Sequence, residues 1–307
     1  MGQARTGMQL VGLLLACALA TSRLGLVAHE LVGHGGAATL VGGHVTEVQL
    51  FWFAGGWIRY TFPAPPSVAE ALFISMGGIL IEILVGVALA TITRRARPLG
   101  TKLIRAIGAA LVIHASWYLA TGAWSGFGDG QLLYKVAGTA RYPIAIAAGA
   151  ITCTVGFFAA RSIVGPLRAT QRTTAAFILA ALVAGGIHVA LSIGEVRFRR
   201  DPTYSVIMQP ERDRQIDRDL AKWEAYERTR GQLTEERRIA EQARLAEVHH
   251  TFPFAWLLGA CAVVAILAGA WRSRIAEDLL TSRLVVRAIA IAGASVLLVI
   301  AIDVITR

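Results

Sequence analysis

Three ionisable side chains lie close together near the start of the chain, where the segment 29–34 reads His-Glu-Leu-Val-Gly-His. We interpret this segment as an HExxH pattern, in which histidines at positions i and i+4 lie on one face of an α-helix and bind the same metal ion. On that interpretation His29 and His34 are metal ligands, and Glu30 lies beside them, where it can take a proton from a metal-bound water. Imidazole and carboxylate donors predict zinc (Zn2+), and the same donors also bind iron or cobalt. The competing interpretation is a polar cluster that forms hydrogen bonds between helices.

A catalytic zinc ion needs a third protein ligand and an open coordination position. We expect Asp129 to be that ligand, because the glycines on either side of it free the backbone to break a helix and turn the carboxylate inward. Glu82 is the alternative, since it is a lone carboxylate in the middle of an apolar run. Three other polar residues stand alone in apolar runs: His114, His188 and Asp303. For the two histidines we expect hydrogen bonds between helices, and for the aspartate, near a helix end, contact with water.

The composition of the chain indicates what kind of protein must position these groups. Of its 307 residues, 55% are hydrophobic and 16% are charged, whereas a soluble domain has about 25% charged residues. The mean hydropathy is +0.56. These values exclude a soluble enzyme and a disordered chain, and three cysteines within apolar segments exclude a secreted disulfide scaffold. The net charge of +10 comes mostly from short loops between apolar runs, where it faces lipid headgroups, so we expect no nucleic-acid partner.

Seven apolar runs predict seven membrane-spanning helices, because a helix of about 20 apolar residues crosses the hydrocarbon core. The runs are 8–42, 68–93, 102–122, 142–161, 173–195, 254–271 and 284–304. The first run is interrupted by Thr-Ser-Arg at 21–23, and we expect one long helix there rather than a cleaved signal peptide.

Two segments between the apolar runs have a different character. Residues 44–62 alternate β-branched and aromatic residues with polar ones around an Ala-Gly-Gly turn, which predicts a β-hairpin. Residues 197–251 carry charges of both signs, which predicts a solvated helix or helix pair; a module that contacts a partner or a substrate is the alternative. The fold class is therefore an all-α polytopic membrane protein of about seven transmembrane helices, with a small β-hairpin after the first and a polar helical insert.

The chain divides into four regions on this basis. Residues 1–141 form a membrane core that contains the expected metal ligands, and residues 142–196 add further transmembrane helices. Residues 197–251 form the polar segment outside the membrane, and residues 252–307 form a C-terminal pair of transmembrane helices.

Residues 10–135 resemble the site-2 protease family of intramembrane zinc metalloproteases. The resemblance rests on the His-Glu segment in the first helix, the glycine-rich hairpin, the small residues in the second helix and the Asp-Gly pair after the third. It implies that His29, His34 and Asp129 bind zinc, that Glu30 is the general base, and that peptide bonds of membrane-protein substrates are hydrolysed within or at the edge of the bilayer. The chain lacks the Asn-Pro and Ala-Gly-Pro elements of that family, so it resembles a divergent member.

Two other functions fit parts of the same pattern. A membrane zinc protease of the prenyl-protein-processing type also uses two histidines and a glutamate base, but takes its third ligand from a glutamate, which here would be Glu82. A membrane scaffold or transporter would bind no metal, and replacement of Glu30 would then change nothing.

The short loops also predict how the chain lies in the membrane. Most of their lysines and arginines fall on the side of the N-terminus, so the positive-inside rule places the N-terminus in the cytoplasm and residues 197–251 outside. The family resemblance implies the opposite orientation, with the hairpin near the cytoplasm. The composition, rich in alanine and arginine, points to the inner membrane of a bacterium.

Overall fold

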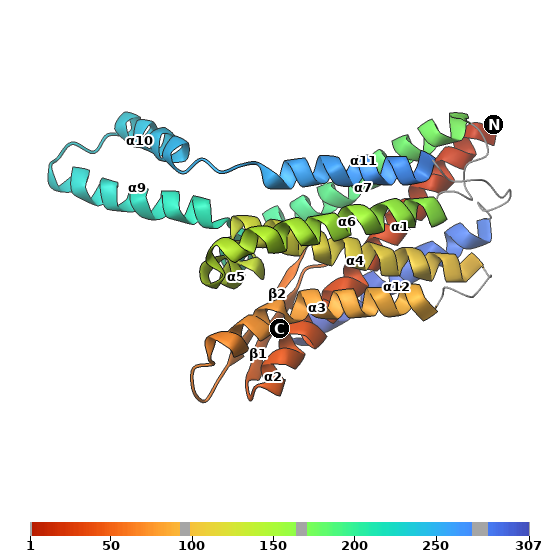
Figure 1. The fold of residues 1–307 in the computed structure, drawn as a ribbon, viewed down its shortest axis with the longest axis horizontal. Coiled ribbons are helices and arrows are strands. Elements are labelled where there is room, and N and C mark those ends of the chain that lie inside the picture. The colour runs from red at the N-terminus through yellow and green to blue at the C-terminus, as the bar shows by residue number, and fades with distance from the viewer. Residues whose placement is uncertain (1, 93–98, 164–170, 272–281, 307) are drawn as a thin grey trace.

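The computed structural model describes residues 2–92, 99–163, 171–271 and 282–306, and most of them are helical. Figure 1 shows the long helices lying side by side along one axis, with α9 and α10 extending beyond one end of the bundle. The elements in chain order are α1 (Gly2–Val27), the π-helix η1 (Ala28–Gly35), α2 (Gly36–Leu40), β1 (His44–Leu50), β2 (Gly56–Thr61), α3 (Val68–Ile92), α4 (Leu99–Ser125), α5 (Gly130–Val136), η3 (Gly138–Ala140), α6 (Arg141–Ile163), α7 (Gln171–Arg199), α8 (Pro202–Met208), α9 (Glu211–Thr229), α10 (Glu235–Val248), α11 (Phe254–Trp271) and α12 (Ser282–Thr306).

Six helices in the described part of the chain are long and apolar enough to cross a membrane. They span Gly7–Leu40, Val68–Ile92, Ile104–Ser125, Gly138–Ser162, Leu179–Arg199 and Val285–Thr306. The chain is therefore a multi-pass membrane protein, as its composition predicts. The remaining predicted span, 254–271, is the apolar helix α11, which is shorter than the other six, so the count of seven stays a prediction.

The first predicted helix is continuous, as expected. α1, η1 and α2 follow one another without a break over Gly2–Leu40, through the polar triplet that ends at Arg23. The buried guanidinium of Arg23 donates hydrogen bonds to the backbone carbonyls of Phe51 and Phe53, at 2.6 and 3.2 Å. A charged residue inside a membrane helix is thereby satisfied by the backbone of the hairpin turn.

The predicted β-hairpin is also present. β1 pairs with β2 in antiparallel fashion, with Val48 opposite Ile58. The hydroxyl of Thr306, at the end of α12, donates to the carbonyl of Val48 at 3.2 Å, so the outer edge of β1 faces α12. β2 lies against the first membrane helix, since a Cβ atom on Gly35 would lie 3.2 Å from the side chain of Ile58.

Glycines allow the membrane helices to approach one another closely. A Cβ atom on Gly86 of α3 would lie 2.6 Å from the carbonyl oxygen of Gly108 on α4, and one on Gly33 of η1 would lie 2.5 Å from the Cα atom of Gly78 on α3. Side-chain carbons do not approach other atoms so closely, so the helices touch backbone to backbone at these positions. Small residues at such contacts are a common means of packing helices within a membrane.

The polar segment 197–251 is helical, as predicted. α9 and α10 pack against each other through a small apolar cluster of Ile216, Leu220 and Leu245. Figure 1 shows that this pair, the hairpin and the C-terminal end of α12 lie at one end of the bundle, while the start of α1 lies at the other. The hairpin and the polar segment therefore lie at the same end of the bundle, opposite the start of α1. This arrangement is expected if every predicted span between them crosses the membrane.

Gly86→Ala is expected to destabilise the bundle, because the added methyl group has no space beside the carbonyl of Gly108. Overpacking of this kind costs about 1–3 kcal/mol. The matched control is Gly185→Ala on α7, where nothing lies within 4 Å of the added carbon and the higher helix propensity of alanine is the main effect. Thermal unfolding in detergent measures both midpoints, and equal shifts in the two variants would contradict the close contact.

Candidate metal centre

The two histidines of the candidate site are five residues apart, because three residues rather than two separate Glu30 from His34. The interpretation of this segment as HExxH is therefore wrong by one residue, and its spacing is HExxxH. In an α-helix, side chains five residues apart point about 140° away from each other, since each residue turns the helix by about 100°. Residues Ala28–Gly35 instead form the π-helix η1, whose wider turn places positions i and i+5 on the same face of the helix. As a result, the Nε2 atoms of His29 and His34 lie 3.2 Å apart.

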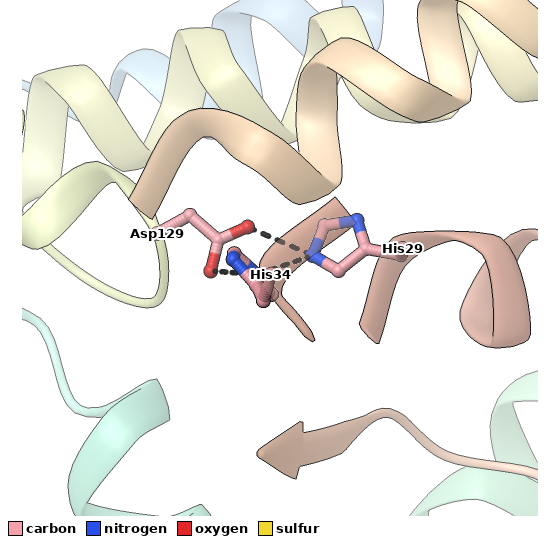
Figure 2. Close-up of side chains that lie close together, drawn as sticks. All are labelled: His29, His34 and Asp129. Carbon is pink, nitrogen blue, oxygen red and sulfur yellow. Dashed lines mark hydrogen bonds and ion pairs between the residues drawn. The ribbon is translucent and has the colours of Figure 1, made fainter. Parts of the chain in front are cut away.

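Asp129 comes from the loop between α4 and α5. Gly126 and Gly128 adopt the left-handed backbone conformation in this loop, with φ of +70° and +52°, and turn the chain back after α4 ends. The carboxylate reaches both histidines: Oδ2 lies 2.8 Å from Nε2 of His29, and Oδ1 lies 3.2 Å from Nε2 of His34. Figure 2 shows the three side chains pointing toward one another. The structure thus brings together the three residues that the sequence predicts as a metal-binding group.

The separations of the donor atoms fit a metal ion. The two Nε2 atoms and the Asp129 oxygens nearest to them are 2.8–3.2 Å apart. Ligand atoms at about 2.0–2.1 Å from a tetrahedral zinc ion lie about 3.3 Å from one another. Within the described structure, the buried Oδ2 atom of Asp129 makes no hydrogen bond, although it lies 2.8 Å from His29. A short contact without hydrogen-bond geometry is expected for two ligand atoms that face a shared third partner.

The other ring nitrogen of His34 fixes its imidazole. Nδ1 lies 2.7 Å from the carbonyl oxygen of Ile74 on α3, and because a carbonyl only accepts, Nδ1 carries the proton. In the neutral ring, Nε2 is then the unprotonated nitrogen, on the side of Asp129 and His29. This tautomer is the one that a metal ligand requires.

The site is buried, and it holds a second carboxylate. His29 and Glu30 are 6% exposed and His34 is 7% exposed. Glu30 follows His29 on η1 and lies within electrostatic range of both histidines and of Asp129. Burial opposes the ionisation of Asp129, but His34 and His29 outweigh it and hold the pKa of this carboxyl below its ordinary value. The site therefore contains two carboxyl groups: that of Asp129, which contacts both histidines, and that of Glu30, which lies nearby.

Glu82, the alternative third ligand, lies on the opposite side of His29. Its Oε1 atom is 3.7 Å from Nδ1 of His29, and its Oε2 atom is 2.9 Å from Nδ1 of His114. Among the described residues, the group of donors that can share one ion contains Asp129 and not Glu82. The expected hydrogen bonds between helices are present, since His114 pairs with Glu82 and Nε2 of His188 lies 3.1 Å from the hydroxyl of Ser22.

Asp303 does not face water, so the expectation for this residue is wrong. Its side chain is fully buried and accepts hydrogen bonds from the amide of Gln49 at 2.8 Å and the indole of Trp52 at 3.1 Å. It also pairs with Arg199 of α7 at 3.1 Å. The residue stands near a helix end, but the hairpin covers that end of α12.

Glu195 is a structural residue that the sequence did not reveal. Its carboxylate accepts hydrogen bonds from three consecutive backbone N–H groups of the hairpin turn, those of Trp52, Phe53 and Ala54, at 2.6, 2.5 and 3.1 Å. Arg199, one turn further along α7, pairs with the same carboxylate at 2.8 Å. The available signal was a carboxylate at the end of an apolar run, which needs partners from the protein.

α8 connects the hairpin to the loop between α4 and α5. On the hairpin side, the ring of Tyr204 lies 4.8 Å from the ring of Phe51. On the other side, the carbonyl of Ile207 accepts a hydrogen bond from the backbone N–H of Gly128 at 2.9 Å. The polar segment therefore holds together the two loops that flank the candidate metal centre.

No protein-family model, curated protein or solved structure matches the chain. The family resemblance therefore rests on residues of the sequence alone. The chemistry of the site rests on its geometry, which combines two imidazoles and a carboxylate with a second carboxylate nearby.

Glu195→Ala is expected to destabilise the hairpin, because it leaves three backbone N–H groups without their acceptor and removes one of the two carboxylates that pair with Arg199. Loss of one partner from a buried ion pair costs about 3–5 kcal/mol. Glu47→Ala is the matched control, since it removes an exposed pair with Arg59 on the same hairpin, for which about 0–1 kcal/mol is expected. Thermal unfolding and the rate of proteolysis at residues 51–55 measure the difference. Equal resistance of the two variants would contradict this role of Glu195.

Proposed function

We propose that the chain is an intramembrane zinc metalloprotease in which His29, His34 and Asp129 hold the zinc ion. The observation that carries the proposal is the convergence of their donor atoms at 2.8–3.2 Å beside the buried Glu30. Three protein ligands leave one coordination position open, which distinguishes a catalytic zinc from a structural one. When bound, the metal would polarise the substrate carbonyl and lower the pKa of a water molecule to about 7.

Glu30 transfers the proton in the proposed reaction. Its carboxylate takes a proton from the attacking water as the new C–O bond forms, and returns that proton to the amide nitrogen as the C–N bond breaks. His29 and His34 are held by the turn of η1, and Asp129 by the glycine loop, so the ligands keep their positions during these steps. Burial of the site strengthens every electrostatic interaction within it.

A transmembrane helix is the substrate class that this location favours. The ligands lie within or next to helices that are apolar enough to cross a membrane, and η1 contacts β2 of the hairpin. A substrate helix must unwind locally, because a helical peptide bond is shielded by the backbone hydrogen bonds around it. The outer edge of β2 would receive the unwound segment as an added strand, since β1 faces α12 and β2 lies beside η1.

Asp129 suits the role of third ligand better than Glu82 does. A zinc protease of the prenyl-protein-processing type would need Glu82 on the Nε2 side of His29, but this carboxylate lies on the Nδ1 side, with Oε1 3.7 Å from Nδ1. A scaffold or transporter without a metal would have no chemical need for the four groups of the site.

We also propose that this protease lies in a bacterial inner membrane, with the hairpin end outside. The distribution of basic residues in the short loops supports this orientation.

Purified wild-type protein is expected to contain about one zinc ion per chain, and His29→Ala and Asp129→Ala are expected to lose it, because each removes one of three ligands. His188→Ala is the matched control, since this histidine pairs with Ser22 outside the donor group. Metal analysis of detergent-purified protein measures all four samples. Zinc that is retained in Asp129→Ala would move the third ligand elsewhere, and a wild-type protein without affinity for zinc would overturn the proposal.

Glu30→Gln is expected to keep its zinc and to lose hydrolysis by roughly 10²- to 10⁴-fold, the usual contribution of a general base. The assay places the protein in liposomes with fluorescent single-span peptides that carry glycine, proline or asparagine near the centre of the span, and identifies products by mass spectrometry. Glu70→Gln is the control, because the hydrogen bonds of this exposed carboxylate of α3 within the described residues are local ones with Ser67. Wild-type protein that binds zinc and cleaves none of the peptides would contradict the protease class.

A further inference from the structure

Glu82 is a carboxylate inside the bundle that the proposed reaction does not use. Its side chain is 2% exposed and lies in the middle of α3, where an isolated charge is costly in a membrane. Two histidines from other helices lie beside it, His29 on η1 and His114 on α4. A carboxylate that is buried between two imidazoles, one of them a candidate metal ligand, indicates a specific role.

The first observation concerns the nitrogen of His29 that faces away from the donor group. Nδ1 is buried and makes no hydrogen bond in the described structure. Oε1 of Glu82 lies 3.7 Å from it, whereas Nε2 of the same ring lies 2.8 Å from Asp129. A histidine that binds a metal through Nε2 carries its proton on Nδ1, and this N–H almost always donates to a carboxylate, a carbonyl or a water.

The second observation is that Glu82 is itself held in place. Its Oε2 atom lies 2.9 Å from Nδ1 of His114, whose ring is stacked on Tyr118 with an interplanar angle of 10°. On α1, Gly25 leaves the space that the carboxylate occupies, because a Cβ atom there would lie 3.0 Å from Oε1. Groups from α1 and α4 therefore fix the carboxylate next to the unpartnered nitrogen of His29.

We propose that Glu82 is a positioning residue of the metal centre, which accepts the Nδ1–H of His29 when the metal is bound, and that His114 holds Glu82 for this role. The separation of 3.7 Å between Nδ1 and Oε1 must then shorten to a hydrogen bond. A carboxylate in this position fixes the tautomer and orientation of the ring and makes Nε2 a stronger donor to the metal. The inference rests on the proposed function, because it requires His29 to bind a metal ion. His34 has a neutral partner instead, the carbonyl of Ile74 at 2.7 Å, so the two ligands differ in the charge behind them.

Zinc affinity tests the proposal, measured on detergent-purified protein by competition with a chromogenic chelator. Glu82→Ala is expected to weaken zinc binding roughly 10- to 100-fold, the usual effect of removing such a partner. Glu82→Gln retains an oxygen that accepts from Nδ1 and is expected to restore most of the affinity. His114→Ala leaves Glu82 in place without its support, and a smaller loss in the same direction is expected.

Thr152→Val is the matched control for these variants. It removes a buried hydrogen bond between two membrane helices, the 2.8 Å contact of Thr152 on α6 with Ser116 on α4. Neither Glu82 nor His29 takes part in this hydrogen bond. We expect it to lower the unfolding midpoint without a change in zinc affinity. An affinity loss in Thr152→Val as large as that in Glu82→Ala would assign the effect to stability and overturn the proposal.

Cobalt substitution gives a second readout that reports the ligands rather than the stability of the fold. The visible spectrum of bound Co2+ is expected to shift in Glu82→Ala and to return toward that of the wild type in Glu82→Gln. Unchanged affinity and spectrum in Glu82→Ala would overturn the role of Glu82 and leave the metal centre intact. If Glu82→Ala does not fold, His114→Ala decides by the same two measurements. Wild-type protein that binds neither ion would instead overturn the metal centre of the proposed function.

Discussion

The π-helical turn in the first membrane helix is the constraint on which the rest of the site depends. It brings the Nε2 atoms of two histidines that are five residues apart within 3.2 Å of each other, but it also widens the helix. α3 accommodates the wider turn with glycines, because Gly33 of η1 touches the backbone of Gly77 and Gly78. A Cβ atom on Gly78 would overlap the imidazole of His29. The same glycines therefore allow η1 and α3 to pack closely and leave space for the imidazole of His29.

The hairpin depends on charges that are buried in the bundle. A two-stranded hairpin is only marginally stable by itself in water. Here the turn is fixed by Arg23, which binds its carbonyls, and by Glu195, which binds its N–H groups. Arg199 and Asp303 complete the network from α7 and α12. Four charged side chains from three membrane helices thus determine where the strand next to η1 lies.

Local patterns in the sequence were sufficient to predict the elements and the three candidate ligands, but not most of the other contacts between elements. Apolar runs and alternation depend on short stretches, and they correctly indicate the long helices and the hairpin. The glycines around Asp129 indicate the loop that turns its carboxylate inward, because φ values of +70° and +52° suit glycine. The histidine spacing misleads when it is taken as α-helical, since the segment is a π-helix that packs against glycines of α3, far away in the sequence. The burial of Asp303 depends on a distant hairpin, so its own neighbours in the sequence carry no sign of it.

The extra residue between Glu30 and His34 also determines how the part of the first helix before η1 is rotated relative to the part after it. Its removal would bring the histidines into α-helical spacing, but would rotate the preceding part of the helix by about 100° and move it by about 1.5 Å relative to α2. Arg23 would then turn away from the carbonyl of Phe51, and Ser22 from His188. The π-helical turn is thus an angular adjustment within one helix. It lets the part near the hairpin face α3 while the part before it faces α7, a combination that an uninterrupted α-helix of this sequence does not provide.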